Sequence, residues 1–155
     1  MLDTLIIFGA KYLYLVVVAL TLYYFYKLSH SQRKSFIILA IISLPLIFLV
    51  SRLTSQFYFD PRPFVVGNFT PLVPHAADNG FPSDHTLLVA ACATLMFVYH
   101  RKASYLIGLV ALLVGLSRVA AGVHHLVDII GSIIIAIIVT ILVHLALKHQ
   151  RLVRY

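Results

Sequence analysis

The sequence predicts an all-α membrane protein: a polytopic helix bundle with about five transmembrane helices, formed by one domain over residues 1–155. Of its 155 residues, 61% are hydrophobic and only 11% are charged, and the mean hydropathy is +0.99. A soluble domain cannot bury so much apolar surface. The apolar residues also gather in runs close to the ~20 residues that a helix needs to cross a bilayer.

Five apolar runs follow one another along the chain, and all but one of their connections are short. The runs cover residues 4–26, 36–59, 85–99, 104–121 and 126–147. The third run is shorter than a full span, so we expect its polar ends to supply the missing length. The long connection, 60–84, holds five of the six prolines and two glycines, which is typical of an ordered but non-helical loop.

The charged residues predict how the bundle is oriented. Eight of the twelve basic residues lie at the ends of the runs that five spans place on one side: Lys27, Arg33, Lys34, Arg101, Lys102, Lys148, Arg151 and Arg154. The five acidic residues all fall on the opposite side: Asp3, Asp60, Asp78, Asp84 and Asp128. Basic residues collect on the cytoplasmic side of membrane proteins, so we expect the N-terminus outside and the C-terminus inside.

This orientation also explains the net charge of +7. In a membrane protein such a charge marks topology, so we do not interpret it as a sign of nucleic-acid binding. Cys92 is the only cysteine, which excludes a disulfide within the chain. The loop 60–84 and the turn between the fourth and fifth runs then share the outer face.

Ionisable residues gather at the turn between the fourth and fifth runs. Arg118, His124 and Asp128 fall within eleven residues, although such groups are costly beside a bilayer. His124 and Asp128 are four apart, a spacing that lets them hydrogen-bond at a helix start. A carboxylate on one imidazole nitrogen fixes the tautomer and leaves the other nitrogen free to act as a nucleophile or base.

The loop adds further groups on the same predicted face. Arg62 stands between Pro61 and Pro63, and the next helix starts at Ser83-Asp84, just before His85. Arginine forks suit phosphoryl oxygens, and helix N-termini favour anions. These groups favour phosphoryl transfer, in which one histidine attacks phosphorus and another protonates the leaving oxygen. No Cys/His cluster or acidic cage is evident in the sequence, so arginines rather than a metal are expected to neutralise the phosphate.

Three motifs carry a resemblance to a known family. The segments DPRP, PSDH and SRVAAGVHHLVD resemble the motifs of the type 2 phosphatidic acid phosphatase superfamily, which also includes vanadium haloperoxidases. Ser117, Arg118, His124 and Asp128 match the third motif in identity and spacing. The stretch YFDPRPFV followed by LVPHAADNGFPSDH is similar to the bacterial undecaprenyl-diphosphate phosphatases of the bacitracin-resistance type. The resemblance covers roughly residues 50–135.

The resemblance implies a role for each matching residue. His124 would be the nucleophile that forms a phosphohistidine, Asp128 would orient it, and His85 would be the general acid. Arg62 and Arg118 would hold the phosphoryl oxygens. The resemblance adds Ser83 and Ser117 to the phosphate-binding set, and it implies no metal and no cofactor.

The chain departs from the family pattern at two positions. The lysine of the first motif would fall at Ser55, which carries no charge, and Arg52 or Lys11 could supply the missing positive charge. Asp84 stands where the general pattern has glycine, either pointing away to stabilise the helix start or contacting the distal part of a diphosphate.

Four other polar residues have weaker assignments. His75 is a candidate substrate-loop residue, and we expect Asp60 and Asp78 to order the loop. His125 is expected to pack against a neighbour or to face the membrane interface.

The sequence as a whole therefore predicts a multi-pass lipid phosphatase of the bacterial cell membrane with an extracytoplasmic active site. Its expected substrate is undecaprenyl diphosphate, cleaved to undecaprenyl phosphate and phosphate, with membrane lipids as its other partners and no nucleic acid. Phosphatidylglycerophosphate or phosphatidic acid is the alternative substrate. A non-catalytic lipid-binding or transport protein is the alternative of another class. The oligomeric state is left open.

Overall fold

The computed structural model describes residues 1–150, and in that part of the chain all the named elements are helices. They are α1 (Leu2–Lys11), α2 (Leu13–Lys27), α3 (His30–Phe57), α4 (Pro63–Val66), α5 (Asp84–Tyr99), α6 (Arg101–Ala120) and α7 (Leu126–His149). One isolated antiparallel bridge joins Pro61 to Asn79 in the loop. The all-α prediction is confirmed.

Three of these helices are long and apolar enough to cross a membrane by themselves: α3, α6 and α7. The helices α1 and α2 pass the same test together, but they are bent by 50° at Tyr12. The remaining apolar helix, α5, has 16 residues and falls short of a full span, as its sequence predicts.

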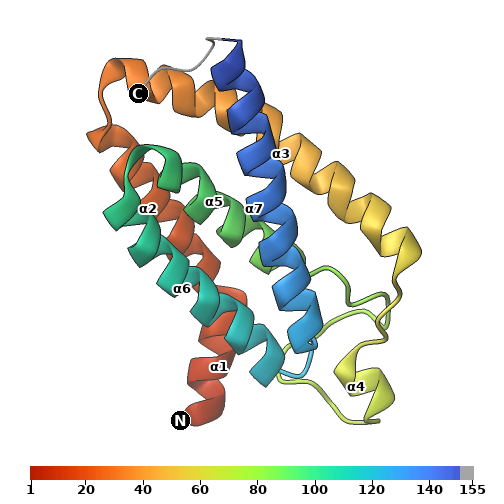
Figure 1. Ribbon diagram of the computed structural model, residues 1–155. Helices are drawn as coiled ribbons and strands as arrows, with labels where there is room; N and C mark the ends of the chain where they lie inside the picture. The colour runs from red at the N-terminus through yellow and green to blue at the C-terminus, as the bar shows by residue number, and fades with distance from the viewer. Residues whose placement is uncertain (151–155) are drawn as a thin grey trace.

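Helix α5 occupies the centre of the bundle, where it packs against α2, α3, α6 and α7 (Figure 1). Its buried face includes the small residues Ala90, Ala91 and Cys92, which allow the neighbouring helices to come close. Large apolar side chains on α3, α6 and α7 are instead exposed on the outside of the bundle. An apolar outer surface around a packed centre is what a lipid environment requires.

The bend at Tyr12 separates two packing partners. Helix α1 lies against α6, where Gly9 contacts the side chain of Ser117. Helix α2 turns away from the axis of α1 and packs against both α5 and α6. Neither Pro nor Gly stands at Tyr12, so tertiary packing and not local sequence accounts for the bend.

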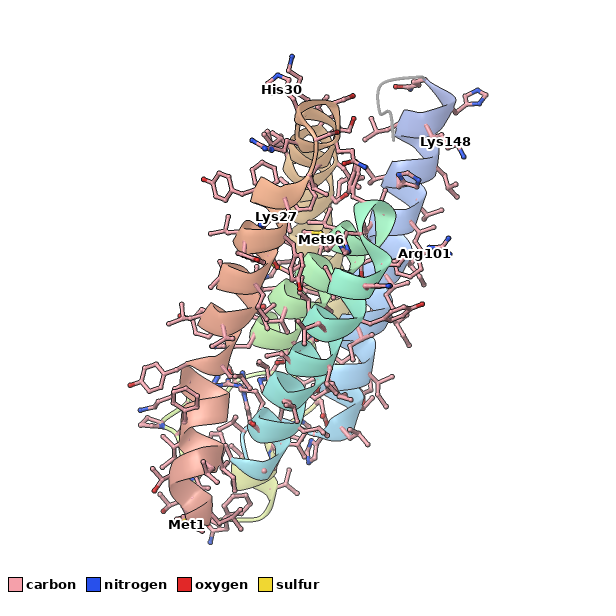
Figure 2. The ribbon with its side chains drawn as sticks, turned by 90° about the vertical axis from the view of Figure 1, so that its left-hand side faces the viewer. Met1, Lys27, His30, Met96, Arg101 and Lys148 are labelled. Atoms are coloured by element: carbon pink, nitrogen blue, oxygen red, sulfur yellow. The ribbon has the colours of Figure 1, made fainter. Side chains whose placement is uncertain are left out.

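Charge is segregated along the bundle axis. Lys27, His30, Arg101 and Lys148 lie in the half of the molecule opposite Met1 (Figure 2). The loop and α4 lie at the same end as the N-terminus (Figure 1). Arg151 and Arg154 fall outside the described residues. The structure therefore agrees with the grouping predicted for the labelled basic residues, while the orientation across a membrane stays a prediction.

Candidate active site

The Pro-rich loop is fixed to the end of α3 by the side chain of Asn79. Its amide donates to the carbonyls of Ser55 and Tyr58, both at 3.0 Å. Its oxygen accepts from the backbone N–H groups of Asp60 at 2.9 Å and Phe81 at 3.0 Å. One side chain therefore joins both ends of the loop to the helix that precedes it.

Arg62 is held inside this loop with its guanidinium aimed at the turn between α6 and α7. Its Nε and NH2 groups donate to one oxygen of Asp78, at 2.9 and 2.8 Å. Its NH1 group donates to the carbonyl of Val123 at 2.9 Å and lies 3.1 Å from His124 Nε2. The side chain is only 6% exposed, whereas that of Asp78 is 60% exposed.

His124 lies in the turn before α7, and its two ring nitrogens have different surroundings. Nδ1 is 3.1 Å from Asp128 Oδ2, so the predicted hydrogen bond is present. The same oxygen accepts the backbone N–H of His125 at 2.9 Å. If Nδ1 carries the proton, it donates a hydrogen bond to Asp128 Oδ2, and the lone pair of Nε2 points at the arginines. The imidazole is then oriented as a nucleophile requires.

A glycine allows the loop to lie directly on the Asp128 carboxylate. A Cβ at Gly80 would stand 2.9 Å from Asp128 Oδ2 and 3.0 Å from the carbonyl oxygen of Asp60. Gly122 is needed in the turn itself, because its φ is +76°. The ring of Phe69 packs where a side chain at Gly122 would point.

The second arginine comes from the last turn of α6. Arg118 is 4% exposed; its NH2 group lies 3.5 Å from His124 Nε2, and its NH1 group donates to the carbonyl of Ala10 at 3.4 Å. Its Nε is buried and has no hydrogen-bond partner among residues 1–150. Two guanidinium groups thus converge on one side of Nε2, where an oxyanion could take over their donors.

Arg62, Arg118 and His124 line a pocket of about 250 Å³. His75 and His85 line the same pocket. His85 stands at the start of α5, and its ring meets Tyr14 edge-on, with ring centroids 5.2 Å apart. The ring of His75 lies across that of His124 at 5.9 Å, and its Nδ1 is buried without a partner in the described part of the chain. Three histidines from separate segments therefore surround one small polar cavity.

The environment of the pocket also shifts the pKa values of its ionisable side chains. Burial, followed by the charges of Arg62 and Arg118, lowers the pKa of His124 to about 3. The same causes lower the pKa of His75. Burial alone raises the pKa of Asp78, but its hydrogen bonds and charge interaction with Arg62 outweigh this and lower it. At neutral pH the site therefore pairs a neutral His124 with charged arginines.

The two departures from the family pattern meet at the mouth of the pocket. Arg52 on α3 and Asp84 at the start of α5 form an ion pair at 3.1 Å, and both line the cavity. Ser55, at the position of the family lysine, lines it as well. Lys11 is exposed at the end of α1 and is not among the lining residues.

Two hydroxyls predicted to bind phosphate, those of Ser83 and Ser117, are not among the groups that line the pocket. Ser83 is fully buried as the N-cap of α5, where its hydroxyl oxygen accepts from the backbone N–H of Thr86 at 3.4 Å. Ser117 donates to the carbonyl of Leu113 at 2.7 Å and packs against α1, because it lies one residue before Arg118 and so on a different helix face. Neither serine is among the residues that line the pocket, and their phosphate contacts stay a prediction.

A cluster next to His124 has the composition of a metal site. Ligand atoms of Asp60, His125 and Asp128 lie within 4.8 Å of one another. His125 Nδ1 and Asp60 Oδ2 already contact each other at 2.8 Å, and Asp128 Oδ2 accepts the two hydrogen bonds described above. His125 is thus paired with the loop, where the sequence predicted only packing or an interface position.

The sequence signalled some of these supporting residues better than others. Asp60 and Asp78 do order the loop as predicted, through His125 and Arg62 respectively. Asn79 and Gly80 were missed as site residues, although Asn-Gly in a Pro-rich segment is a strong turn signal. The contact of Gly80 with Asp128 joins residues 48 positions apart, which no local pattern reveals.

Known proteins are similar to this chain in sequence and in fold. The Undecaprenyl-diphosphatase BcrC of Bacillus subtilis (strain 168) is 36% identical over 138 residues, which cover 89% of this chain and 71% of that protein. Phosphatidylglycerophosphatase B of the same strain is 36% identical over 88 residues, 49% of this chain and 42% of the relative. The crystal structure of the PAP2 type phosphatidylglycerolphosphate phosphatase from Bacillus subtilis superposes with a TM-score of 0.67 at 22% identity, over 99% of this chain and 79% of that one.

A protein-family model also matches most of this chain. The model described as PAP2 superfamily matches residues 54–151, which include Arg62, His85, Arg118, His124 and Asp128. The match takes in the whole Pro-rich loop, both flanking helix ends and all of α5 and α6. The chain belongs to the PAP2 superfamily.

Proposed function

We propose that this PAP2-superfamily membrane protein is a lipid diphosphate phosphatase that converts undecaprenyl diphosphate to undecaprenyl phosphate and phosphate. The observation that carries the proposal is the arrangement at His124, whose Nδ1 meets Asp128 while Nε2 faces two buried arginines. The similarity to the Undecaprenyl-diphosphatase BcrC supports the choice of substrate.

The proposed reaction has two steps, and each uses the contacts described above. The lone pair of His124 Nε2 attacks the terminal phosphorus, and the bond from phosphorus to the bridging oxygen breaks. His85 gives its proton to that oxygen, so the lipid monophosphate leaves. A water molecule then attacks the phosphohistidine while His85 accepts a proton, which releases phosphate and restores neutral His124.

The arginines supply the electrostatic part of the mechanism. Arg62 and Arg118 are fixed by protein partners before substrate arrives, so little reorganisation is needed when charge develops on the phosphoryl oxygens. Asp128 stabilises the positive charge that His124 carries while it is phosphorylated. The proposed chemistry uses only side chains of this chain, and the proposed location of the pocket is the outer face of the bacterial cell membrane.

Phosphate release from undecaprenyl diphosphate in detergent, with excess EDTA, tests this proposal. We expect wild type to release phosphate and His124→Ala to lose at least about 10³-fold in rate, because the covalent route needs the imidazole. His149→Ala is the matched control, since that histidine is exposed at the end of α7 distant from the pocket. Equal release by wild type and His124→Ala would exclude His124 as the nucleophile.

Two further outcomes separate the alternatives. Hydrolysis of phosphatidylglycerophosphate or phosphatidic acid in place of the diphosphate would keep the mechanism and change the substrate. No hydrolysis of any of these lipids by the folded protein would favour a non-catalytic lipid-binding role.

A further inference from the structure

A third arginine stands at the mouth of the pocket, separate from the two that reach His124. The NH2 group of Arg52 donates to both carboxylate oxygens of Asp84, each at 3.1 Å. The side chains are 51% and 62% exposed, whereas that of Arg62 is 6% exposed. All three residues line the same cavity. The pocket therefore has a buried cationic end at the nucleophile and an exposed cationic end at its opening.

The position of Arg52 is fixed by more than its ion pair. Its guanidinium carbon lies 4.7 Å from the centre of the Phe48 ring, one turn earlier on α3. Asp84 belongs to the first turn of α5, directly before His85. Arg52 is thus paired with the residue that directly precedes His85, the proposed general acid, and all three residues line the same pocket.

The pair is weak enough to exchange partners. Exposed ion pairs contribute little to stability because water and salt screen them. The lipid-linked phosphate of a diphosphate carries one negative charge, as a carboxylate does, and offers an arginine two acceptor oxygens in the geometry of its fork. An anion that reaches the mouth can therefore displace Asp84 from Arg52 at small cost.

We propose that Arg52, held at the pocket mouth by Asp84, binds the second phosphate of a diphosphate and makes the site prefer diphosphates to phosphomonoesters. The inference rests on the proposed function and deepens it. When a diphosphate is cleaved and His85 protonates the bridging oxygen, the leaving lipid monophosphate still carries a negative charge beside Arg52. When a phosphomonoester is cleaved, the leaving alcohol needs only the proton of His85. Arg52 is therefore a specificity-determining residue.

A purely structural role for the pair predicts something different. If Arg52–Asp84 only tied α3 to α5, removing it would lower stability and affect every ligand alike. If it recognises the second phosphate, the ratio between diphosphate and monophosphate ligands must change. That ratio is the decisive readout.

Binding measured without turnover tests the inference directly. The probes are methylenediphosphonate, a non-hydrolysable diphosphate, and inorganic phosphate, titrated into the detergent-solubilised full chain. We expect Arg52→Ala to weaken methylenediphosphonate binding by about tenfold or more, because a hydrogen bond between charged groups is lost. Phosphate binding should stay within about twofold of wild type. Equal losses for both probes, or no loss for either, would overturn the inference.

Two more variants sharpen the experiment. Arg101→Ala is the matched control, since Arg101 also lies over an aromatic ring, that of Phe97 at 5.5 Å, but does not line the pocket. It should bind both probes as wild type does. Asp84→Asn frees Arg52 and removes a negative charge from the mouth, so both probes should bind more tightly. Weaker binding by Asp84→Asn would contradict the exchange of partners.

Kinetics give the functional counterpart. For Arg52→Ala, kcat/KM should fall by about tenfold or more for farnesyl diphosphate and by less than about threefold for farnesyl monophosphate. Because the binding ratio is measured without hydrolysis, it decides the role of Arg52 even if wild type cleaves neither lipid. That last result would count against the proposed function alone.

Discussion

At the scale of single residues, the chemistry depends on which nitrogen of one imidazole is left free. Asp128 Oδ2 meets both His124 Nδ1 and the backbone N–H of His125, so one oxygen fixes the ring and the start of α7 together. The guanidinium groups of Arg62 and Arg118 lie at 3.1 and 3.5 Å from the other nitrogen. The same two charges that would bind a phosphate also disfavour protonation of His124.

The protonation of His124 gives a prediction at this scale. A histidine with the ordinary pKa of about 6.5 is almost fully protonated at pH 5. The pKa of His124 is lowered to about 3, so its neutral form persists as the pH falls through 6.5 and is lost only in strong acid. Nitrogen NMR of the chain labelled at histidine should show a neutral imidazole for His124 at pH 5. A signal that becomes protonated between pH 7 and 5, and is absent from His124→Gln, would contradict this.

At the scale of elements, the site depends on how closely α7 and the loop approach each other. The ring of Phe81 occupies the space beside Gly131, where any side chain would overlap ring carbons. Phe81 also meets Tyr58 edge-on, with centroids 4.9 Å apart, just after the end of α3. The segment that leads into His85 is therefore clamped between two helices.

The close approach at Gly131 predicts that Gly131→Ala displaces Phe81 and the start of α5. Because small misplacements of catalytic groups are costly, we expect kcat/KM to fall by about 10- to 100-fold while helix content is retained. Gly108→Ala is the control, since its new Cβ would meet that of Ala93 at an ordinary 3.9 Å. Adding Phe81→Leu to Gly131→Ala should restore part of the activity. Full activity in Gly131→Ala would show that the clamp is dispensable.

The elements also show which features the sequence could predict. The helical class and the extents of the later spans follow from apolar runs, because composition alone decides whether a segment is stable in lipid. The contact between His124 and Asp128 follows from their spacing beside a helix start. These are local properties, and local sequence contains them.

Other features depended on packing between distant segments. The run 4–26 predicts one continuous span, yet the structure breaks it at Tyr12, where α1 follows α6 and α2 turns towards α5. The pair Arg52–Asp84 joins residues 32 positions apart, so the sequence could offer Arg52 as a source of charge without naming its partner. For Ser117, the motif matched in full, but the helix face decided that its side chain meets α1.

At the scale of the whole molecule, the Pro-rich loop and the labelled basic residues lie at opposite ends. The loop and Met1 share one end, and the labelled basic residues Lys27, Arg101 and Lys148 lie in the other half (Figures 1 and 2). Residues of this loop line the pocket. This arrangement predicts that the pocket end is extracytoplasmic.

Single cysteines can test this orientation in a Cys92→Ser background. Cys92 is buried and is the only cysteine in the chain, so its removal leaves no competing thiol. In intact cells, a membrane-impermeant maleimide should label Thr70→Cys in the loop. It should label Ser31→Cys at the other end only after the membrane is opened. Both positions are exposed in the structure. The reverse pattern would invert the proposed topology.

The shortness of α5 has a consequence for how the protein meets its substrate. Its 16 residues rise about 24 Å, less than the roughly 30 Å of bilayer hydrocarbon. If α5 crosses the bilayer centrally, its first turn, which holds His85, lies near the boundary between hydrocarbon and headgroups. A lipid phosphate can then reach the pocket by lateral diffusion within its leaflet, with its tail still dissolved in the bilayer. Encounter is two-dimensional, and the relevant concentration is the surface density of the lipid in the membrane.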